Sequence, residues 1–361
     1  MAERKTVMYR VVCDGHTIHD DRLDKVQVHN GRLTLELGKT GLFDFTIWSD
    51  NPHFDSVQII KPIVEVFRDD ESIFRGRVLD IKIGMYGEKQ VSCEGELAFL
   101  YDSFFEPQMY YGGFVDFLDN VISQHNYQVE AAKQFKAGAV TVGDLFPFEV
   151  DQTEWKTTLD TLVERMVTPS SGYLQVRHEG GVRYVDLLSY YVDISNQSAQ
   201  DIILGKNLLD IKQEINGGAV FSGIIPLGAE VGGNRVDIRS VNNGSPSILN
   251  QEAVALYGRI YKVVTFDDIT DAATLKLRAA NYLAEQFAAA TTVEITAADL
   301  SPIGLAADTF RVGQWVNVIS EYHFDQPQLF LIRNISIMLS DPSETRITIG
   351  RAKQGLTDSI I

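Results

Sequence analysis

Two stretches of the sequence, 256 positions apart, share one pattern of apolar residues. The first covers residues 73–95 and the second covers residues 329–351, and the two match without a gap. Apolar and polar residues alternate in both, which is typical of a β-strand that buries one face. The matched apolar pairs are Phe74 with Phe330, Leu79 with Ile335, Ile81 with Ile337, Ile83 with Leu339, Val91 with Ile347, and Cys93 with Ile349.

A further short strand is predicted before each copy, over residues 63–66 and 315–318, which lie 252 positions apart. The hairpin loop of the second copy would then be four residues longer. Loops accept insertions at little cost, whereas a one-residue slip inside a strand would turn its apolar side chains outward. We therefore predict two copies of one small β domain, the alternative being two hairpins that are alike by chance. A duplicated module favours an architectural role.

Composition and charge narrow the classes of function. At 361 residues the chain can form two or three domains, each with its own core. The net charge is −17 and Lys and Arg form no cluster, so we expect no specific binding of nucleic acid. The first residues lack the apolar run of a signal peptide, and we expect no membrane segment. Cys13 and Cys93 are too few for a disulfide framework, and Cys93, on an alternating strand, is expected to be a buried reduced thiol.

The pattern of elements predicts a β-rich α+β fold with several domains. Residues 1–106 contain five or six short strands and are predicted to form a small β-barrel, with Asn30 and Gly31 as a two-residue hairpin turn. Residues 107–200 form an α+β domain with two helices, one starting after Gly113 and one near residues 151–154. A second β-barrel of the same kind covers residues 201–227 and 291–353. It is interrupted by an α+β insertion over residues 228–290 with one long helix, and residues 354–361 form a tail.

The long helix of the insertion is expected to be capped by Thr270 or Asp271. Its predicted buried stripe consists of Leu275, Ala279, Tyr282, Leu283 and Phe287.

Residues with catalytic chemistry form no convincing site in the sequence. His16 and His19 stand near carboxylates, but positions three apart on a strand point to opposite faces, so a polar turn is preferred over a metal site. The motifs of serine hydrolases, zinc hydrolases and phosphate-binding loops do not occur. We therefore expect no catalytic residues, no metal and no cofactor.

An aromatic run at the first domain boundary is the remaining candidate for a contact surface. Such a run fits either a core between domains or a contact between subunits, and the core is the simpler interpretation. Its aromatic residues are Tyr101, Phe104, Phe105, Tyr110 and Tyr111.

Several segments, in this order and spacing, resemble phage tail-associated proteins of the prophage tail endopeptidase family and the baseplate hub proteins of contractile phages. The resemblance covers nearly the whole chain. The segments that carry it are residues 78–81, 207–211, 224–228, 257–260, 266–271 and 312–316.

The resemblance implies a structural hub at the tail tip or baseplate of a virion, made in the cytoplasm of a bacterial host. It implies a homotrimer whose six β modules dock on the hexameric tail tube or on the distal tail protein and form or close the DNA channel. A spike, fibre or tape-measure protein is a further implied partner. The endopeptidase label is not carried over, because the chain ends at Ile361 and we expect no peptidase domain in it. The alternatives are a tail-associated cell-wall hydrolase and a receptor- or carbohydrate-binding module.

Overall fold

A computed structural model describes most of the chain. The described residues are 7–142, 148–170, 172–189, 195–215, 220–267, 269–301, 309–324, 326–341 and 344–352. Within these ranges, no helix is long and apolar enough to cross a membrane.

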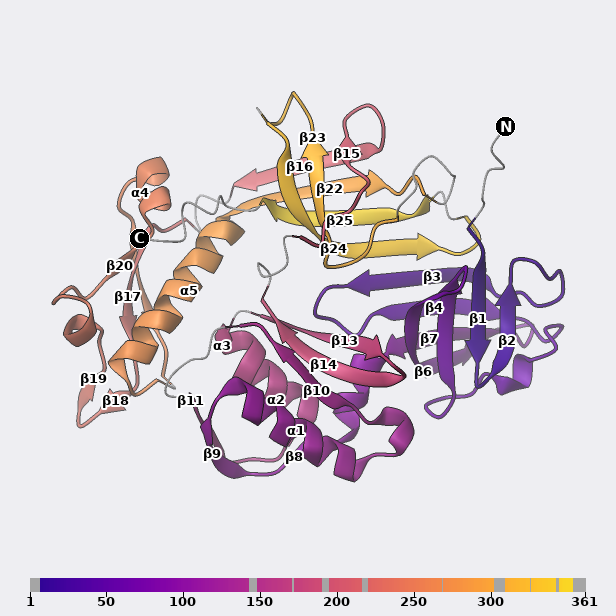
Figure 1. Cartoon of the computed structure of the whole chain (residues 1–361), viewed down its shortest axis with the longest axis horizontal. Helices are drawn as coiled ribbons and strands as arrows, with labels where there is room; N and C mark the ends of the chain where they lie inside the picture. The colour runs from indigo at the N-terminus through magenta and orange to yellow at the C-terminus, as the bar shows by residue number, and fades with distance from the viewer. Residues whose placement is uncertain are drawn as a thin grey trace.

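A sheet of 13 strands forms the body of the molecule and is built from both ends of the chain (Figure 1). We call its N-terminal half the first module and its C-terminal half the second module. The strands of the first module are β1 (Tyr9–Cys13), β2 (His16–Asp20), β3 (His29–Glu36), β4 (Leu42–Ile47), β5 (Ile63–Arg68), β6 (Glu71–Ile83) and β7 (Lys89–Gly95). Those of the second module are β15 (Ile202–Ile203), β16 (Leu208–Ile215), β22 (Thr291–Ala298), β23 (Trp315–Ile319), β24 (Gln328–Met338) and β25 (Arg346–Ala352).

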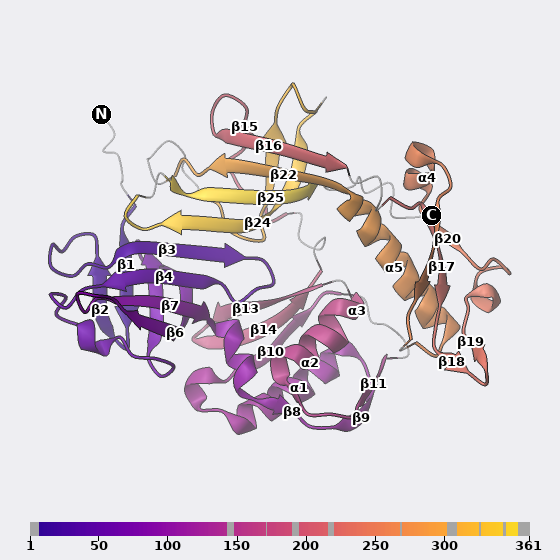
Figure 2. The same ribbon diagram turned by 180° about the vertical axis from the view of Figure 1, so that it is seen from behind.

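An α+β unit follows the first module and lies beneath the sheet in both views (Figure 1 and Figure 2). Its helices are α1 (Phe114–Gln128), α2 (Thr158–Leu162) and α3 (Thr168–Ser170), with a π-helical turn over Val163–Val167 between the last two. Its strands are β8 (Phe104–Phe105), β9 (Gln108–Gly112), β10 (Lys136–Val140), β11 (Phe148–Gln152), β12 (Lys156–Thr157), β13 (Tyr173–Glu179) and β14 (Val182–Leu188).

A second α+β unit is inserted between β16 and β22 and lies at the end of the molecule away from the first module (Figure 1). Its long helix α5 (Ala272–Ala290) packs on the small sheet β20-β17-β21. The other elements are β17 (Gly223–Leu227), β18 (Glu230–Val231), β19 (Asn234–Arg235), β20 (Ile248–Leu249), α4 (Gln251–Tyr257) and β21 (Tyr261–Thr265). Short 3-10 turns occur at Phe54–Ser56, Glu96–Asp102, Ala131–Lys133 and Arg239–Val241.

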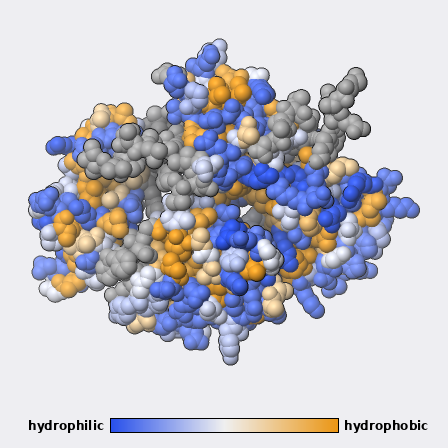
Figure 3. All heavy atoms as spheres, in the orientation of Figure 1, coloured by the Kyte–Doolittle hydropathy of each residue, from blue (hydrophilic) through white to orange (hydrophobic). Residues whose placement is uncertain are grey.

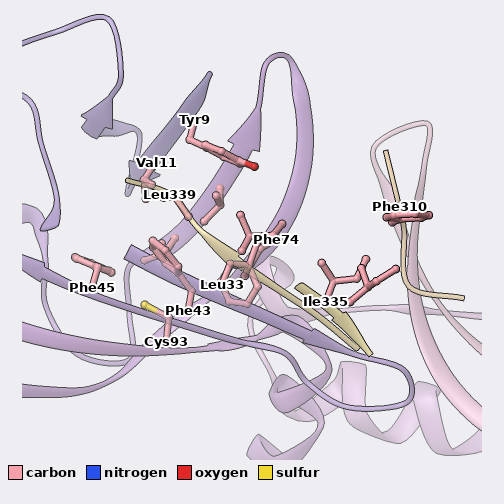
Figure 4. Packing of buried hydrophobic residues seen from close by; sticks show 14 of the residues in the cluster. Tyr9, Val11, Leu33, Phe43, Phe45, Phe74, Cys93, Phe310, Ile335 and Leu339 are labelled. Atoms are coloured by element: carbon pink, nitrogen blue, oxygen red, sulfur yellow. The ribbon is translucent and has the colours of Figure 1, made fainter. Parts of the chain in front are cut away.

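The two modules share one continuous hydrophobic core. Leu33, Phe43 and Cys93 of the first module belong to the same buried cluster as Ile335 and Leu339 of the second (Figure 4). Each α+β unit has a separate core of its own. The β-rich α+β class expected from the sequence is therefore confirmed.

Asn30 and Gly31 do not form the hairpin turn that the sequence predicts. They lie inside β3, where Asn30 has a φ of 53° and the pairing with β4 shifts register between His29 and Arg32. The pair therefore forms a β-bulge, which needs the same backbone freedom as a hairpin turn. A Cβ atom at position 31 would lie 3.2 Å from Cδ2 of Leu339, so a glycine here lets β24 approach closely.

The second predicted helix begins later than the sequence indicates. Residues up to Gln152 form β11, Trp155 is 60% exposed, and α2 starts only after Thr157. The Oγ1 atom of Thr157 accepts a hydrogen bond from the amide of Asp160 at 3.1 Å, which makes this threonine the N-cap.

The other predictions for helices have mixed outcomes. Asp271 does cap α5, with its Oδ2 atom 2.8 Å from the amide of Thr274. Hydrogen bonds from backbone amides hold the pKa of the Asp271 carboxyl below its ordinary value. The side chain of Phe287 lies outside the described part of the structure.

The strand at residues 223–227, expected in the second module, belongs to the small sheet of the insertion.

Glu96 ties the first module to the α+β unit that follows it. Its carboxylate lies 2.5 Å from Nη1 of Arg75 on β6, 2.5 Å from Nε2 of His178 on β13, and 3.0 Å from Nη1 of Arg183 on β14. Only 3% of the Glu96 side chain is exposed. Burial opposes its ionisation, but the hydrogen bond from His178 and the charge of Arg75 outweigh this and lower the pKa of Glu96.

Replacing Glu96 by Gln is expected to lower the free energy of unfolding by about 2–3 kcal/mol, because the partly buried guanidinium groups of Arg75 and Arg183 would lose their counter-charge. A lowered carboxyl pKa stabilises the fold above its ordinary value of 4.5, and this contribution is lost as the pH falls below that value. Denaturation of the wild type by urea should therefore show a loss of stability below about pH 4.5 that is smaller in the variant.

Glu130→Gln is the matched control, because 77% of the Glu130 side chain is exposed beside Lys133. It should change stability far less than Glu96→Gln does, because an exposed ion pair contributes little. Equal effects of the two substitutions would contradict the role assigned to Glu96.

Candidate functional site: the module junction and two free strand edges

The two modules have the same order of strands. Five neighbouring strands of the first module run in the order β3-β4-β7-β6-β5, and five of the second run in the order β16-β22-β25-β24-β23. Every neighbouring pair in both series is antiparallel. The series differ at the sixth strand, because β1 is antiparallel to β5 whereas β15 is parallel to β23. Each strand of one series therefore has a counterpart at the same place in the other.

The strand pairing shows that residues of β6 and β24 correspond at an offset of 254 positions, two fewer than in the gapless sequence match. Ile81 pairs with Val91, and Ile335 pairs with Ile347, which is the counterpart of Val91. Ile335 therefore corresponds to Ile81 and not to Leu79, at an offset of 254 positions. A shift of two residues leaves every side chain on the same face, so the alternation of apolar residues could not reveal it.

The same shift divides the extra length of the second module between two hairpin loops. The β23–β24 hairpin is two residues longer than the β5–β6 hairpin, and the β24–β25 hairpin is two residues longer than the β6–β7 hairpin. The sequence match places all four extra residues in the first of these loops.

A β-bulge at the same place in both strands supports this correspondence. The register between β6 and β7 shifts at Leu79, and that between β24 and β25 shifts at Arg333, its counterpart. Bulges kink a strand locally and are specific features of a fold. The shared bulge is a second structural mark of the duplication, besides the order of the strands.

One ladder between β24 and β3 joins the modules into a single sheet. It pairs the segment 334–338 of β24 with the segment 36–32 of β3. At its two ends the Leu37 amide donates to the Arg333 carbonyl and the Leu339 amide donates to the Gly31 carbonyl, both at 2.8 Å. We call this ladder the module junction.

The side chains on the inner face of the module junction are fully packed. Leu33 of β3 is 0% exposed, and Ile335, Ile337 and Leu339 from the β24 side are each 2% exposed. Figure 4 shows Leu33, Ile335 and Leu339 among the residues of the shared core. The junction therefore buries apolar side chains as well as satisfying backbone groups.

Charged groups make a second contact between the modules. The Glu71 carboxylate at the start of β6 lies 3.2 Å from Nε of Arg311, and Nη1 of Arg68 donates to Oγ1 of Thr309 at 2.9 Å. Burial raises the pKa of Glu71, but the hydrogen bond and charge of Arg311 outweigh this and lower it. About half of the Glu71 side chain is exposed, so this contact adds little to stability.

The strands that correspond to β24 and β3 each have an edge without a strand partner among the described residues. The end of β6, residues 80–83, pairs only with β7, although the matching part of β24 has β3 on its other side. Likewise β16 pairs only with β22, although β3 has β24 on its other side. Figure 2 shows β16 at the outer border of the sheet. We call these two segments the β6 edge and the β16 edge.

The exposed apolar residues of the β6 edge are the counterparts of buried residues at the module junction. Ile83 is 74% exposed and its counterpart Ile337 is 2% exposed. Met85 is 90% exposed and its counterpart Leu339 is 2% exposed. On the β16 edge, Leu209 is 53% exposed. The sequence match could not reveal this contrast, because exposure depends on strand pairing that the sequence pattern does not record.

The predicted aromatic run divides between core and surface. Phe105 is 0% exposed and its ring meets that of Phe117, with centroids 5.5 Å apart. Tyr110 packs on the same ring at 4.9 Å. The other three aromatic residues, Tyr101, Phe104 and Tyr111, are 46%, 47% and 67% exposed.

His16 and His19 have separate surroundings. The ring of His16 stacks on His53, with centroids 5.1 Å apart. His19 is buried, and its Nδ1 atom accepts a hydrogen bond from the amide of Val28 at 3.2 Å. In the described part of the chain, no three metal-binding side chains gather closely enough to hold an ion.

Both cysteines lie in the shared core, and the sequence predicts this burial for Cys93. Burial raises the pKa of Cys13 to about 11 and also raises that of Cys93. The two thiols therefore stay protonated and unreactive at neutral pH.

Two serine–histidine hydrogen bonds occur among the described residues, and neither forms an open catalytic site. The Oγ atom of Ser103 lies 2.6 Å from Nδ1 of His125, but both residues are 0% exposed and no substrate can reach them. The Oγ atom of Ser320 lies 2.8 Å from Nδ1 of His323 within a single turn. In that turn the Ser320 side chain is almost fully buried.

Comparisons with known proteins agree with the resemblance found in the sequence. Residues 195–360 match the family described as prophage endopeptidase tail. No curated protein sequence matches the chain.

Several solved structures share the fold over nearly their whole length. The 43 kDa tail protein of prophage MuSo2 from Shewanella oneidensis has a TM-score of 0.67 at 15% identity, covering 96% of this chain and 98% of that one. A tail protein from Neisseria meningitidis also has a TM-score of 0.67, at 16% identity, covering 97% and 98%. Prophage tail protein gp18 from Listeria monocytogenes has a TM-score of 0.58 at 11% identity, covering 97% and 96%. The chain therefore has the fold of prophage tail proteins, and its resemblance to phage tail-associated proteins is confirmed.

Truncating the module junction should destabilise both modules together. Ile337→Ala removes three buried carbon atoms from the shared core, and we expect the free energy of unfolding to fall by about 3 kcal/mol. Hydrogen exchange should show faster exchange of amides in β3 as well as in β24, because the two strands belong to one ladder.

Val115→Ala on α1 is the control, because Val115 is 58% exposed. It should change stability by less than about 0.5 kcal/mol. Faster exchange confined to β24 would show that the modules open independently and would contradict a single cooperative sheet.

Proposed function

We propose that the protein is a structural hub of a phage or prophage tail tip. Three chains form a ring of six β modules, and this ring docks on the hexameric tail tube or on the distal tail protein and forms or closes the DNA channel. The carrying observation is that the two modules have the same strand order, the same bulge and one continuous sheet. Two equivalent modules in each of three chains match a partner with sixfold symmetry.

The fold and the charge of the chain support this role. The proteins of known structure with the same fold are tail proteins of prophages. The net charge of −17 disfavours adhesion of DNA to the protein, which suits a component that DNA passes. Hydrophilic and hydrophobic residues are interspersed over the face shown in Figure 3.

The word endopeptidase in the name of the matched family makes a tail-associated cell-wall hydrolase the rival function. The described serine–histidine pairs do not favour it, because one is fully buried and the other is closed within a turn. We therefore assign no catalytic activity to the described residues. A spike, fibre or tape-measure protein remains a further partner of the hub.

Assembly on the tail tests the proposed function. Light scattering of the protein, alone and mixed with the tail tube and distal tail protein of the same phage, should give a species of three times the 40.3 kDa chain mass or a complex containing three chains. Incubation with peptidoglycan should release no fragments. A stable monomer that binds neither tail component would overturn the proposal. Cleavage that disappears in a His16→Ala, His19→Ala double variant would establish the hydrolase instead.

A further inference from the structure

We propose that neighbouring copies of the chain join by pairing the β6 edge of one copy with the β16 edge of the next, in the register of the module junction. This inference rests on the proposed ring of chains and specifies the contact that closes it. Within one chain, β24 of the second module pairs with β3 of the first. The counterparts of these two strands, β6 and β16, have no such partner among the described residues.

The register between copies follows from the two correspondences. Residues of β24 and β6 correspond at an offset of 254 positions, and residues of β3 and β16 correspond at an offset of 178. Transferring the junction ladder places Ile83 opposite Ile211 of the second copy and Lys82 opposite its Lys212. The same ladder places Gly84 opposite Asp210.

Backbone groups along both edges have no strand partner among the residues that the structure describes. An exposed strand edge carries a row of unpaired amides and carbonyls and is a template for pairing with another chain. The transferred ladder would supply these partners over the same five positions that the module junction uses. A second copy is therefore a better occupant than an unrelated peptide, because its register is already present in the fold.

The apolar side chains of the two edges match those of the module junction. Ile83 and Ile211 take the places of Ile337 and Leu33, which are 2% and 0% exposed. Met85 would lie beside Leu209 of the second copy, in the place where Leu339 packs on Gly31. Because Gly31 has no side chain and Leu209 has one, the flexible Met85 side chain must turn aside to pack on Leu209. Pairing would thus bury three side chains that are exposed in the single chain. They are Ile83 at 74%, Met85 at 90% and Leu209 at 53%.

Charges on the outer face of the edges alternate in a complementary way. Lys82 follows Asp80 on one edge, and Lys212 follows Asp210 on the other. The two lysines stand directly opposite each other, which is unfavourable, but each has the aspartate of the other copy on its diagonal. The same register places Asp80 directly opposite Glu214, a second unfavourable pair, and puts Glu214 on the other diagonal of Lys82. Diagonal neighbours in a ladder are within reach of long side chains, so the five charges form a mixed cluster.

The contact is heterologous, because the β6 edge of one copy meets a different edge of the next. A repeated heterologous contact forms a closed ring if its rotation closes and a helical filament if it does not. The interface between copies and the junction within a chain would then be two versions of one contact. This explains how a ring of three chains can present six equivalent modules.

A disulfide between copies tests the register. In the module junction, Ser336 and Thr34 face each other as a non-hydrogen-bonded pair. The Cα atoms of such a pair are about 4.5 Å apart, which suits a disulfide. The counterpart of this pair between copies is Lys82 with Lys212. A double variant Lys82→Cys, Lys212→Cys should therefore form a disulfide-linked trimer on oxidation, visible on a non-reducing gel. The native Cys13 and Cys93 are buried and should not interfere.

Matched double variants control for geometry and chance collision. Ser336→Cys with Thr34→Cys should form its disulfide within one chain and stay at the monomer position of a denaturing gel. Lys82→Cys with Leu209→Cys places both thiols on exposed positions of the same two edges but on opposite faces, and it should not cross-link.

The outcomes separate this inference from the proposed function. A trimer by light scattering without a Lys82–Lys212 disulfide would overturn the strand pairing and leave the hub intact. Covalent species longer than three chains would support the pairing and contradict the closed ring. A monomer at the highest soluble concentration, with no cross-link, would overturn both.

A charge on the β6 edge should prevent assembly without harming the fold. Ile83→Asp would bury an unpaired carboxylate between copies, and we expect association to weaken at least about tenfold. Its thermal unfolding at low protein concentration should match that of the wild type, because Ile83 is largely exposed in the single chain. Val115→Asp is the control with comparable exposure. Unchanged assembly of Ile83→Asp would overturn the proposed contact.

Discussion

The backbone ladder between β24 and β3 is the interaction on which the rest of the architecture depends. Backbone amides and carbonyls of a strand need hydrogen-bond partners. In this chain the groups on one side of β24 bond to β3 of the first module. The ladder fuses the two ends of the chain into one sheet with one core. Both α+β units are attached to that sheet, one through the buried Glu96 and the other as an insertion between β16 and β22.

The duplication also explains why the β6 edge and the β16 edge have no strand partner in the described part of the chain. Two copies of a module that joins to its neighbour through one donor edge and one acceptor edge can satisfy only one such contact within the chain. The other acceptor, β16, is the last strand at one border of the sheet, and the other donor is the end of β6, beyond its pairing with β5. The exposed Ile83 and the buried Ile337 are thus the same position of one module before and after its contact is made.

The sequence predicts the duplicated strands, the α+β class and three buried positions on α5, Leu275, Ala279 and Leu283. It succeeds there because alternation and helical periodicity record which side chains are buried. Sequence-based prediction fails where the same residues are compatible with two backbone conformations. Asn30 and Gly31 fit both a hairpin turn and a β-bulge. It also fails by two residues in matching β6 to β24, since that shift preserves the buried face. The free edges could not be predicted from Ile83 or Met85 alone, because their exposure depends on strand pairing far away in the sequence.

The central claim is that one contact is used twice, once within each chain and once between chains. An electron cryomicroscopy map of the assembled tail tip, or of the purified ring, tests it most directly. The account predicts a continuous ring of six modules in which the density of β6 from one chain runs beside β16 of the next, with Ile83 facing Ile211. A ring in which Ile83 faces solvent, or in which the chains meet only through the α+β units, would contradict it.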